Sequence, residues 1–156
     1  MVTTRTTTVR DIMTRDPICV DAAATIRELA SILVRNGISG VPVVGANGKL
    51  VGVASKSDLV RRCVEGEQGR DPHYLFSVIS EPDAYTMRAE PLILVGDFMS
   101  TDPVTACPDE SVADVAHRMA EQGVHRLIIV DEELQPIGIV TTLDVLRAFP
   151  DGTRKR

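Results

Sequence analysis

The chain has 156 residues, of which 44% are hydrophobic and 3% aromatic, and its formal net charge is −5. This length suits one ordinary domain, or two small halves that share a core of mainly aliphatic side chains. The acidic balance argues against general affinity for nucleic acid or an anionic membrane, because both need a basic surface. No apolar run approaches the ~20 residues of a membrane-spanning helix.

The cysteines and the N-terminus point to a reducing compartment. Cys19, Cys63 and Cys107 are odd in number and widely spaced, which indicates neither a disulfide framework nor a zinc site. The first residues contain no apolar stretch of the signal-peptide kind. We therefore expect a cytoplasmic protein without a metal site.

An internal repeat organises the chain. The stretch GVASKSDLV, residues 52–60, returns as GIVTTLDVL, residues 138–146. Shifting the chain by the distance between these two stretches aligns residues 9–61 with residues 95–147 without a gap. The apolar pattern is shared throughout, so we interpret the two copies as one structural unit used twice. The positions identical in both copies are, by their first-copy numbers, Val9, Asp11, Met13, Asp16, Pro17, Ala30, Gly37, Val44, Gly52, Asp58 and Arg61.

The first copy predicts a β-α-β-β-α order. A short helical turn ends before Pro17, because proline disfavours helix in the residue that precedes it, and a strand follows at 18–20. Thr25 and Glu28 form a capping box that begins a helix, which Gly37 ends in the left-handed conformation. Apolar runs at 41–44 and 50–54 then predict buried strands joined by an Asn-Gly turn, followed by a helix at 57–64.

The second copy predicts the same elements. Its strands fall at 104–106, 127–130 and 137–141, its helices begin at the Ser111–Asp114 capping box and at 142, and Gly123 is its helix cap. A partial helix near 72–79 is expected in the long connector, where it would cover one face. The predicted domains are 9–64 for repeat 1, 65–94 for the connector and 95–149 for repeat 2, with flexible tails at 1–8 and 150–156.

The repeated motif has a structural interpretation. Ser55 with Asp58, and Thr141 with Asp144, match the [ST]-x-x-[DE] capping pattern, in which the hydroxyl accepts from helix-start amides and the carboxylate favours the positive end of the helix. The glycine three residues before each hydroxyl would then allow close backbone packing within a strand.

The same motif has a functional interpretation that does not exclude the first. A strand end, a hydroxyl and a carboxylate at a helix start make a polar corner at the edge of an apolar sheet. A carboxylate that accepts two hydroxyl donors suits the cis-diol of a ribose, and free amides at the helix start suit a phosphate. An adenine ring would lie against Val, Ile and Pro side chains.

A family resemblance joins these motifs. GVASKSD and GIVTTLD, with DIMTRDP and DFMSTDP upstream and GVPVV and RLIIV between, resemble two cystathionine β-synthase (CBS) domains in tandem, a stand-alone Bateman module. The resemblance implies an α+β fold of two β-α-β-β-α repeats, packed sheet to sheet with pseudo-twofold symmetry around two clefts. It also implies a regulatory sensor of AMP, ADP or ATP, in some members of NAD or S-adenosylmethionine, that is not an enzyme and requires no cofactor.

The resemblance implies ligand-binding residues in both clefts. Asp58 and Asp144 match the ribose-binding aspartates of the family, and Ser55 and Thr141 match its hydroxyl position. The implied adenine contacts are Ile18, Ile38, Ser39, Val41 and Pro42 in one cleft, and Val104, Val124 and Leu127 in the other, within the segments 38–42 and 124–128.

The segment GVHRLIIVDE, residues 123–132, resembles the γ subunit of AMP-activated protein kinase. The resemblance implies that His125 and Arg126 contact nucleotide phosphates, whereas the first copy carries uncharged Ser39 and Gly40 there. In the family geometry Asp58 shares a cleft with His125, so we expect phosphates to be held best in that cleft. The other cleft would prefer a less charged ligand or stay empty.

Two rival hypotheses remain. An enzyme is disfavoured because the chain has no GxSxG, HExxH, P-loop or CxxC pattern. A dimerising module with vestigial clefts is the alternative function, since the second helices, DLVRRCV and LDVLRAF, carry apolar residues on more than one side. We expect a homodimer under either function, and a ligand signal would pass through it or to an unidentified protein target.

Overall fold

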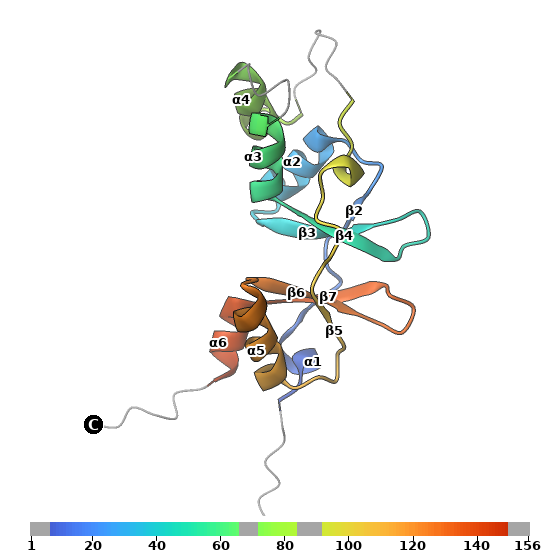
Figure 1. Cartoon of the computed structure of the whole chain (residues 1–156), viewed down its shortest axis with the longest axis vertical. Helices are drawn as coiled ribbons and strands as arrows, with labels where there is room; N and C mark the ends of the chain where they lie inside the picture. Colours follow the sequence, from blue (N-terminus) through green and yellow to red (C-terminus); the bar gives the residue numbers. More distant parts are fainter. Residues whose placement is uncertain (1–6, 66–71, 84–91, 150–156) are drawn as a thin grey trace, which may run out of the picture. The chain divides into compact units, whose positions relative to one another are not determined.

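The computed structural model describes residues 7–65, 72–83 and 92–149. It divides into two compact units, of which unit 2 is Ile18–Asp102 and unit 1 combines Met1–Pro17 with Pro103–Arg156. Each unit has its own sheet with helices beside it (Figure 1). The unit boundaries differ from those of the repeats, because the segment that leads the first repeat belongs to the unit of the second.

Unit 2 is built on a three-stranded sheet in the order β2-β3-β4. The strand β3 pairs in parallel with β2 and antiparallel with β4. The helices α2, α3 and α4 lie on one side of this sheet (Figure 1). The bounds are β2 Val20–Asp21, α2 Ile26–Arg35, β3 Gly40–Val44, β4 Leu50–Ser55, α3 Lys56–Glu65, α4 Pro72–Ser80 and the 3₁₀ helix η2 Val95–Asp97.

Unit 1 repeats this plan on a sheet in the order β1-β7-β6-β5. The strand β6 pairs in parallel with β5 and antiparallel with β7, as β3 does with β2 and β4. The bounds are α1 Val9–Ile12, β1 Thr14–Arg15, β5 Thr105–Ala106, α5 Val112–Gln122, β6 Arg126–Val130, β7 Pro136–Thr141 and α6 Thr142–Ala148. The predicted α+β class and the β-α-β-β-α order are confirmed, while the sheet-to-sheet packing of the repeats stays an expectation.

The helix ends follow the predicted capping chemistry, with one correction. Glu28 N donates to Thr25 Oγ1 over 3.2 Å and Thr25 N donates to Glu28 Oε2 over 2.6 Å, which completes the first capping box. In the second, Asp114 N donates to Ser111 Oγ, but the Asp114 carboxylate accepts from the Ser111 hydroxyl and not from its amide. This box is therefore only half formed.

Glycines end both helices as predicted. Gly37 has φ 61° and Gly123 has φ 63°, the left-handed region that glycine adopts without a Cβ penalty. The short strands begin later than predicted, at Val20 and Thr105, because their parallel pairing with β3 and β6 begins only there.

The two repeats exchange their leading segments, so that each segment packs in the unit of the other repeat. Val9 is fully buried in the core of unit 1, and Val95 is fully buried in the core of unit 2. Met13 and Met99 pack against the same two cores. The leading segment of each repeat thus completes the apolar core beside the sheet of the other repeat.

The predicted connector helix is present as α4. Its side chains Tyr74 and Val78 are buried in the core of unit 2, and the helix contacts α2 and α3. Arg27 of α2 fixes the end of α4 by donating to Ser77 Oγ over 2.9 Å and to the carbonyls of Ser77 and Glu81 over 3.3 Å. The connector residues 66–71 and 84–91, and most of the predicted tails, lie outside the described residues.

Candidate functional site

The first copy of the motif lies where β4 meets α3. Ser55 N and Ser55 Oγ donate to Asp58 Oδ2 over 2.9 Å and 2.7 Å, and Asp58 N donates to Ser55 Oγ over 3.3 Å. The side chains therefore cap the start of α3, as the structural interpretation predicts. Asp58 is only 6% exposed, and it is one of two buried polar residues among the described part of the chain.

The second copy forms the same cap where β7 meets α6. Thr141 N and Thr141 Oγ1 donate to Asp144 Oδ2 over 2.8 Å and 2.7 Å, and Asp144 N donates to Thr141 Oγ1 over 3.3 Å. The bonds of the two caps agree within 0.1 Å. In both copies the cap uses Oδ2, which leaves the Oδ1 oxygen for another partner.

A loop from the preceding helix meets the motif in each unit. Lys56 N donates to Ser39 O over 3.0 Å in unit 2, and Thr142 N donates to His125 O over 3.0 Å in unit 1. The residue after each loop pairs with the motif hydroxyl residue across the sheet, since Gly40 lies opposite Ser55 and Arg126 opposite Thr141. The predicted loop and motif residues of each copy therefore gather at one end of their own sheet, where β3 and β6 begin and β4 and β7 end.

The predicted apolar contacts differ in exposure. Val41 and Leu127 are buried in the cores of their units, so what they can offer a ligand is their backbone. Pro42 is also buried, whereas Ile18 and Ser39 are exposed and Ile38, Val104 and Val124 are half-buried. His125 is exposed and Arg126 is half-buried.

Proline makes the two strands inequivalent at one backbone position. Ile128 N donates to Val104 O over 3.1 Å in unit 1. The matching residue of unit 2 is Pro42, which has no N–H and cannot donate to Ile18 O. The predicted meetings of Asp58 with His125 and of Asp144 with Ser39 join residues of different units and stay predictions.

Arg61 is a residue of the motif region to which the sequence interpretation gave no role. Its Nη2 donates to Asp58 Oδ1 over 2.5 Å, an i,i+3 ion pair on α3. Arg147 holds the same position after Asp144, yet within the described residues it makes no such bond, and Asp144 is half-buried. The spacing of three residues was the available signal, but both copies carry it and only one forms the pair.

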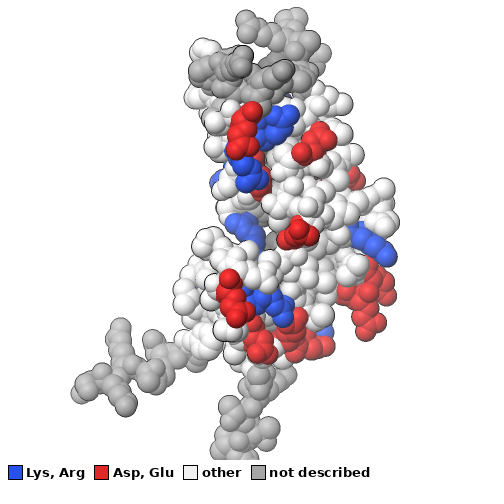
Figure 2. Space-filling view, viewed as in Figure 1, with Lys and Arg blue, Asp and Glu red and all other residues white. Residues whose placement is uncertain are grey.

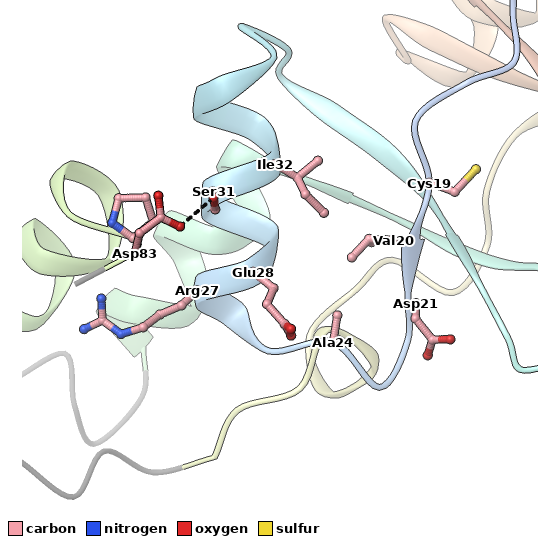
Figure 3. Close-up of a pocket in the computed structure, with 10 residues that line it drawn as sticks. Cys19, Val20, Asp21, Ala24, Arg27, Glu28, Ser31, Ile32 and Asp83 are labelled. Atoms are coloured by element: carbon pink, nitrogen blue, oxygen red, sulfur yellow. Dashed lines mark hydrogen bonds between the residues drawn. The ribbon is translucent and has the colours of Figure 1, made fainter. Parts of the chain in front are cut away.

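A surface pocket of about 390 Å³ lies over α2 in unit 2 (Figure 3). Its charged side chains are already committed to contacts within the protein. Asp83 accepts from Ser31 Oγ over 2.9 Å and from Arg35 over 2.6 Å, and the Glu28 and Asp21 carboxylates accept from backbone amides. We therefore interpret this pocket as part of the structural contact between α2 and the connector. The lining residues are Cys19, Val20, Asp21, Ala24, Arg27, Glu28, Ser31, Ile32, Pro82 and Asp83.

The surface charge agrees with the composition. Basic side chains lie beside acidic ones on the face shown in Figure 2 and form no continuous basic patch there. Within residues 7–65, 72–83 and 92–149, no three metal-ligating side chains cluster, and no helix has the length and apolar character needed to cross a bilayer. None of the three cysteines forms a disulfide, and burial raises the pKa of the Cys19 and Cys63 thiols.

Curated relatives share this sequence at modest identity. The protein MJ1426 of Methanocaldococcus jannaschii is 32% identical over 153 residues, which cover 90% of each chain. The L-aspartate semialdehyde sulfurtransferase of the same organism is 27% identical over 143 residues, 92% of this chain. The chain spans only 23% of the length of that enzyme.

Solved structures share the fold. The CBS domain pair of MJ0100, crystallised with 5′-methylthioadenosine and S-adenosyl-L-methionine, is 26% identical with a TM-score of 0.71, covering 92% of this chain and 96% of that one. CBSX2 of Arabidopsis thaliana, crystallised with AMP, is 29% identical with a TM-score of 0.67, covering 90% and 94%. The CBS domain profile matches residues 9–65 and 95–151. The chain therefore belongs to the CBS domain family and carries two copies of that domain in tandem.

Proposed function

We propose that this chain is a regulatory module that binds an adenosine nucleotide of the AMP, ADP or ATP type. The observation that carries the proposal is the duplicated corner in which a strand end, a hydroxyl and a carboxylate meet with the same bond lengths in both units. Each carboxylate is an acceptor suited to the vicinal hydroxyls of a ribose. The related MJ0100 was crystallised with two ligands that contain adenosine and CBSX2 with AMP, which supports recognition of an adenosine group.

The nucleotide phosphates are proposed to meet His125 and Arg126. These residues stand at the loop beside the second motif, where the first copy has Ser39 and Gly40. An arginine guanidinium is a strong partner for phosphate oxygens. The family geometry would put these cations in one cleft with Asp58, so phosphate-rich ligands are expected in that cleft.

The proposed module is non-catalytic and works as a homodimer. Apolar side chains are exposed on α3 at Val60 and Val64 and on α6 at Leu143 and Leu146. Exposed apolar patches on helices are typical of protein interfaces. The ligand state would then pass through the dimer or to a protein target, in the reducing cytoplasm that three cysteines without a disulfide favour.

The alternative is a dimerisation module with vestigial clefts. The exposed apolar side chains of α3 and α6 favour it, because they require an interface and no ligand. The closure of both carboxylates into local caps favours it as well. Binding measurements separate the two functions.

Calorimetric titration of the purified protein with AMP, ADP, ATP, NAD, S-adenosylmethionine and adenosine tests the proposal. One or two ligands per chain, with affinity that varies with the phosphates, would support a nucleotide sensor. Absence of binding by every ligand at concentrations of about 1 mM would contradict it and leave the dimerisation module.

A further inference from the structure

The two carboxylates of the repeated motif differ in one contact. Each Oδ2 is used by its own cap, with bond lengths that agree between the units. The Oδ1 of Asp58 also accepts from Arg61 Nη2 over 2.5 Å. Among the described residues the Oδ1 of Asp144 has no such partner, although Arg147 follows it at the same spacing as Arg61 follows Asp58.

The two aspartates also differ in their exposure to solvent. The Asp58 side chain is 8% exposed and that of Arg61 is 53% exposed, so the guanidinium reaches the carboxylate from the solvent side. Asp144 is half-buried, and its open oxygen is the one that its cap does not use. A ribose that donates two hydroxyls to Asp58 must displace Arg61, whereas at Asp144 it meets an oxygen without that competitor.

We infer that Arg61 gates the first ribose site by occupying the Asp58 oxygen that the ribose hydroxyls need, so that the site at Asp144 binds an uncharged adenosine ligand first. The inference rests on the proposed function and specifies how the two copies of its site differ. The Arg61–Asp58 ion pair is half-exposed, so the cost of breaking it should weaken adenosine binding at the Asp58 site by roughly two- to fivefold.

The test uses adenosine, because a ligand without phosphate is not itself attracted by the arginine. Asp144→Ala leaves only the Asp58 site, and adding Arg61→Met keeps the apolar stem of the side chain while removing its charge. Adenosine should then bind about two- to fivefold more tightly in the double variant than in Asp144→Ala alone. The matched pair, Asp58→Ala with and without Arg147→Met, should show equal affinities.

Ionic strength gives a second readout on the same proteins. Salt screens the Arg61–Asp58 pair, so adenosine binding to Asp144→Ala should tighten as salt rises, while binding to Asp58→Ala should not change. Thermal unfolding verifies that each variant folds. If loss of the cap unfolds an alanine variant, Asp→Asn replaces it, because the amide oxygen can still accept the cap bonds.

The outcomes distinguish this inference from the proposed function. Wild-type protein that binds adenosine, together with an Arg61→Met substitution that leaves affinity unchanged or weaker, would overturn the gate alone. Failure of wild type and every variant to bind any of the adenosine ligands would overturn the proposed function, and the gate with it.

Discussion

Gly52 in β4 lies directly against the backbone of Ser100. A Cβ built on Gly52 would stand 2.6 Å from Ser100 O, closer than non-bonded carbon and oxygen atoms approach. The contact is fixed by a bridge in which Val53 N donates to Ser100 O over 3.0 Å and Ser100 N donates to Val53 O over 2.9 Å. The repeated glycine therefore leaves the space in which the leading segment of the other repeat lies against the strand.

The Gly52→Ala substitution should destabilise the protein by about 1–3 kcal/mol, because a backbone carbonyl cannot move aside as a side chain can. Gly138→Ala should cost less, since the nearest atom to its Cβ position is Met13 Sδ, the end of a flexible side chain, at 2.6 Å. Urea unfolding of both variants measures the difference in free energy of unfolding.

Gly45→Ala is the matched control for this comparison. Its Cβ would meet only side-chain atoms, the nearest of them Val51 Cγ1 at 3.3 Å. If Gly52→Ala proved as stable as Gly45→Ala, close approach to Ser100 would not explain the repeated glycine.

Glu110 should make the stability of unit 1 depend on acid pH. Burial of this carboxyl opposes its ionisation, but hydrogen bonds from Arg118 and the Cys107 amide outweigh that effect and lower its pKa. Since the folded-state pKa lies below the unfolded one, the stabilisation is present above the unfolded pKa and declines as pH falls through the folded pKa.

The Glu110→Gln substitution should therefore destabilise the protein by about 1–2 kcal/mol at pH 7 and by progressively less below about pH 4. Unfolding by urea at a series of pH values measures both free energies. Asp109→Asn, beside it in the exposed pair with Arg10, is the control that should change little. A constant difference between Glu110→Gln and wild type across this range would contradict the assignment.

Arg27 should hold the connector helix in place. Its three hydrogen bonds to Ser77 and Glu81 satisfy acceptors near the end of α4. In Arg27→Ala these acceptors should lose their protein donor and be hydrated instead. Hydrogen exchange of residues 72–83 should become faster in this variant, with the exchange of α5 unchanged. Arg10→Ala, which removes an exposed ion pair of unit 1, is the control and should leave the connector as slow as in wild type.

Arg126 should distinguish charged from uncharged ligands. If the guanidinium meets phosphates, Arg126→Ala should weaken ATP binding by about 10- to 150-fold and change adenosine binding by less than about twofold. Calorimetry with both ligands measures the ratio, and the exposed Arg147 provides a control substitution in the same unit. Equal losses for ATP and adenosine would remove Arg126 from the phosphate site.

Leu146 should belong to the proposed dimer interface. Its side chain is 66% exposed on α6, and Leu134, in the turn between β6 and β7, is 55% exposed. Leu146→Asp would bury a charge in an apolar interface, so sedimentation should find a monomer, while Leu134→Asp should sediment as wild type does. Wild-type protein that sediments as a monomer at every concentration would contradict the dimer itself.

The sequence by itself determined the elements and their chemistry. Hydrophobic periodicity, the Thr25–Glu28 capping box and the glycine caps depend on residues within a few positions of one another, so local physics predicts them. The duplicated Ser/Thr-x-x-Asp motif is local in the same sense, and its caps form in both copies as predicted. Even the connector helix followed from composition and length.

Only the tertiary structure decided which segments complete which core. Val9 and Met13 pack with the second repeat because burial of apolar surface rewards any complementary partner, near or far in sequence. The sequence could not predict the ion pair of Arg61 with Asp58 either, because Arg147 stands at the same spacing from Asp144 without pairing. The rotamer that an arginine adopts depends on the burial and shape around its partner, and those properties arise only when the chain has folded.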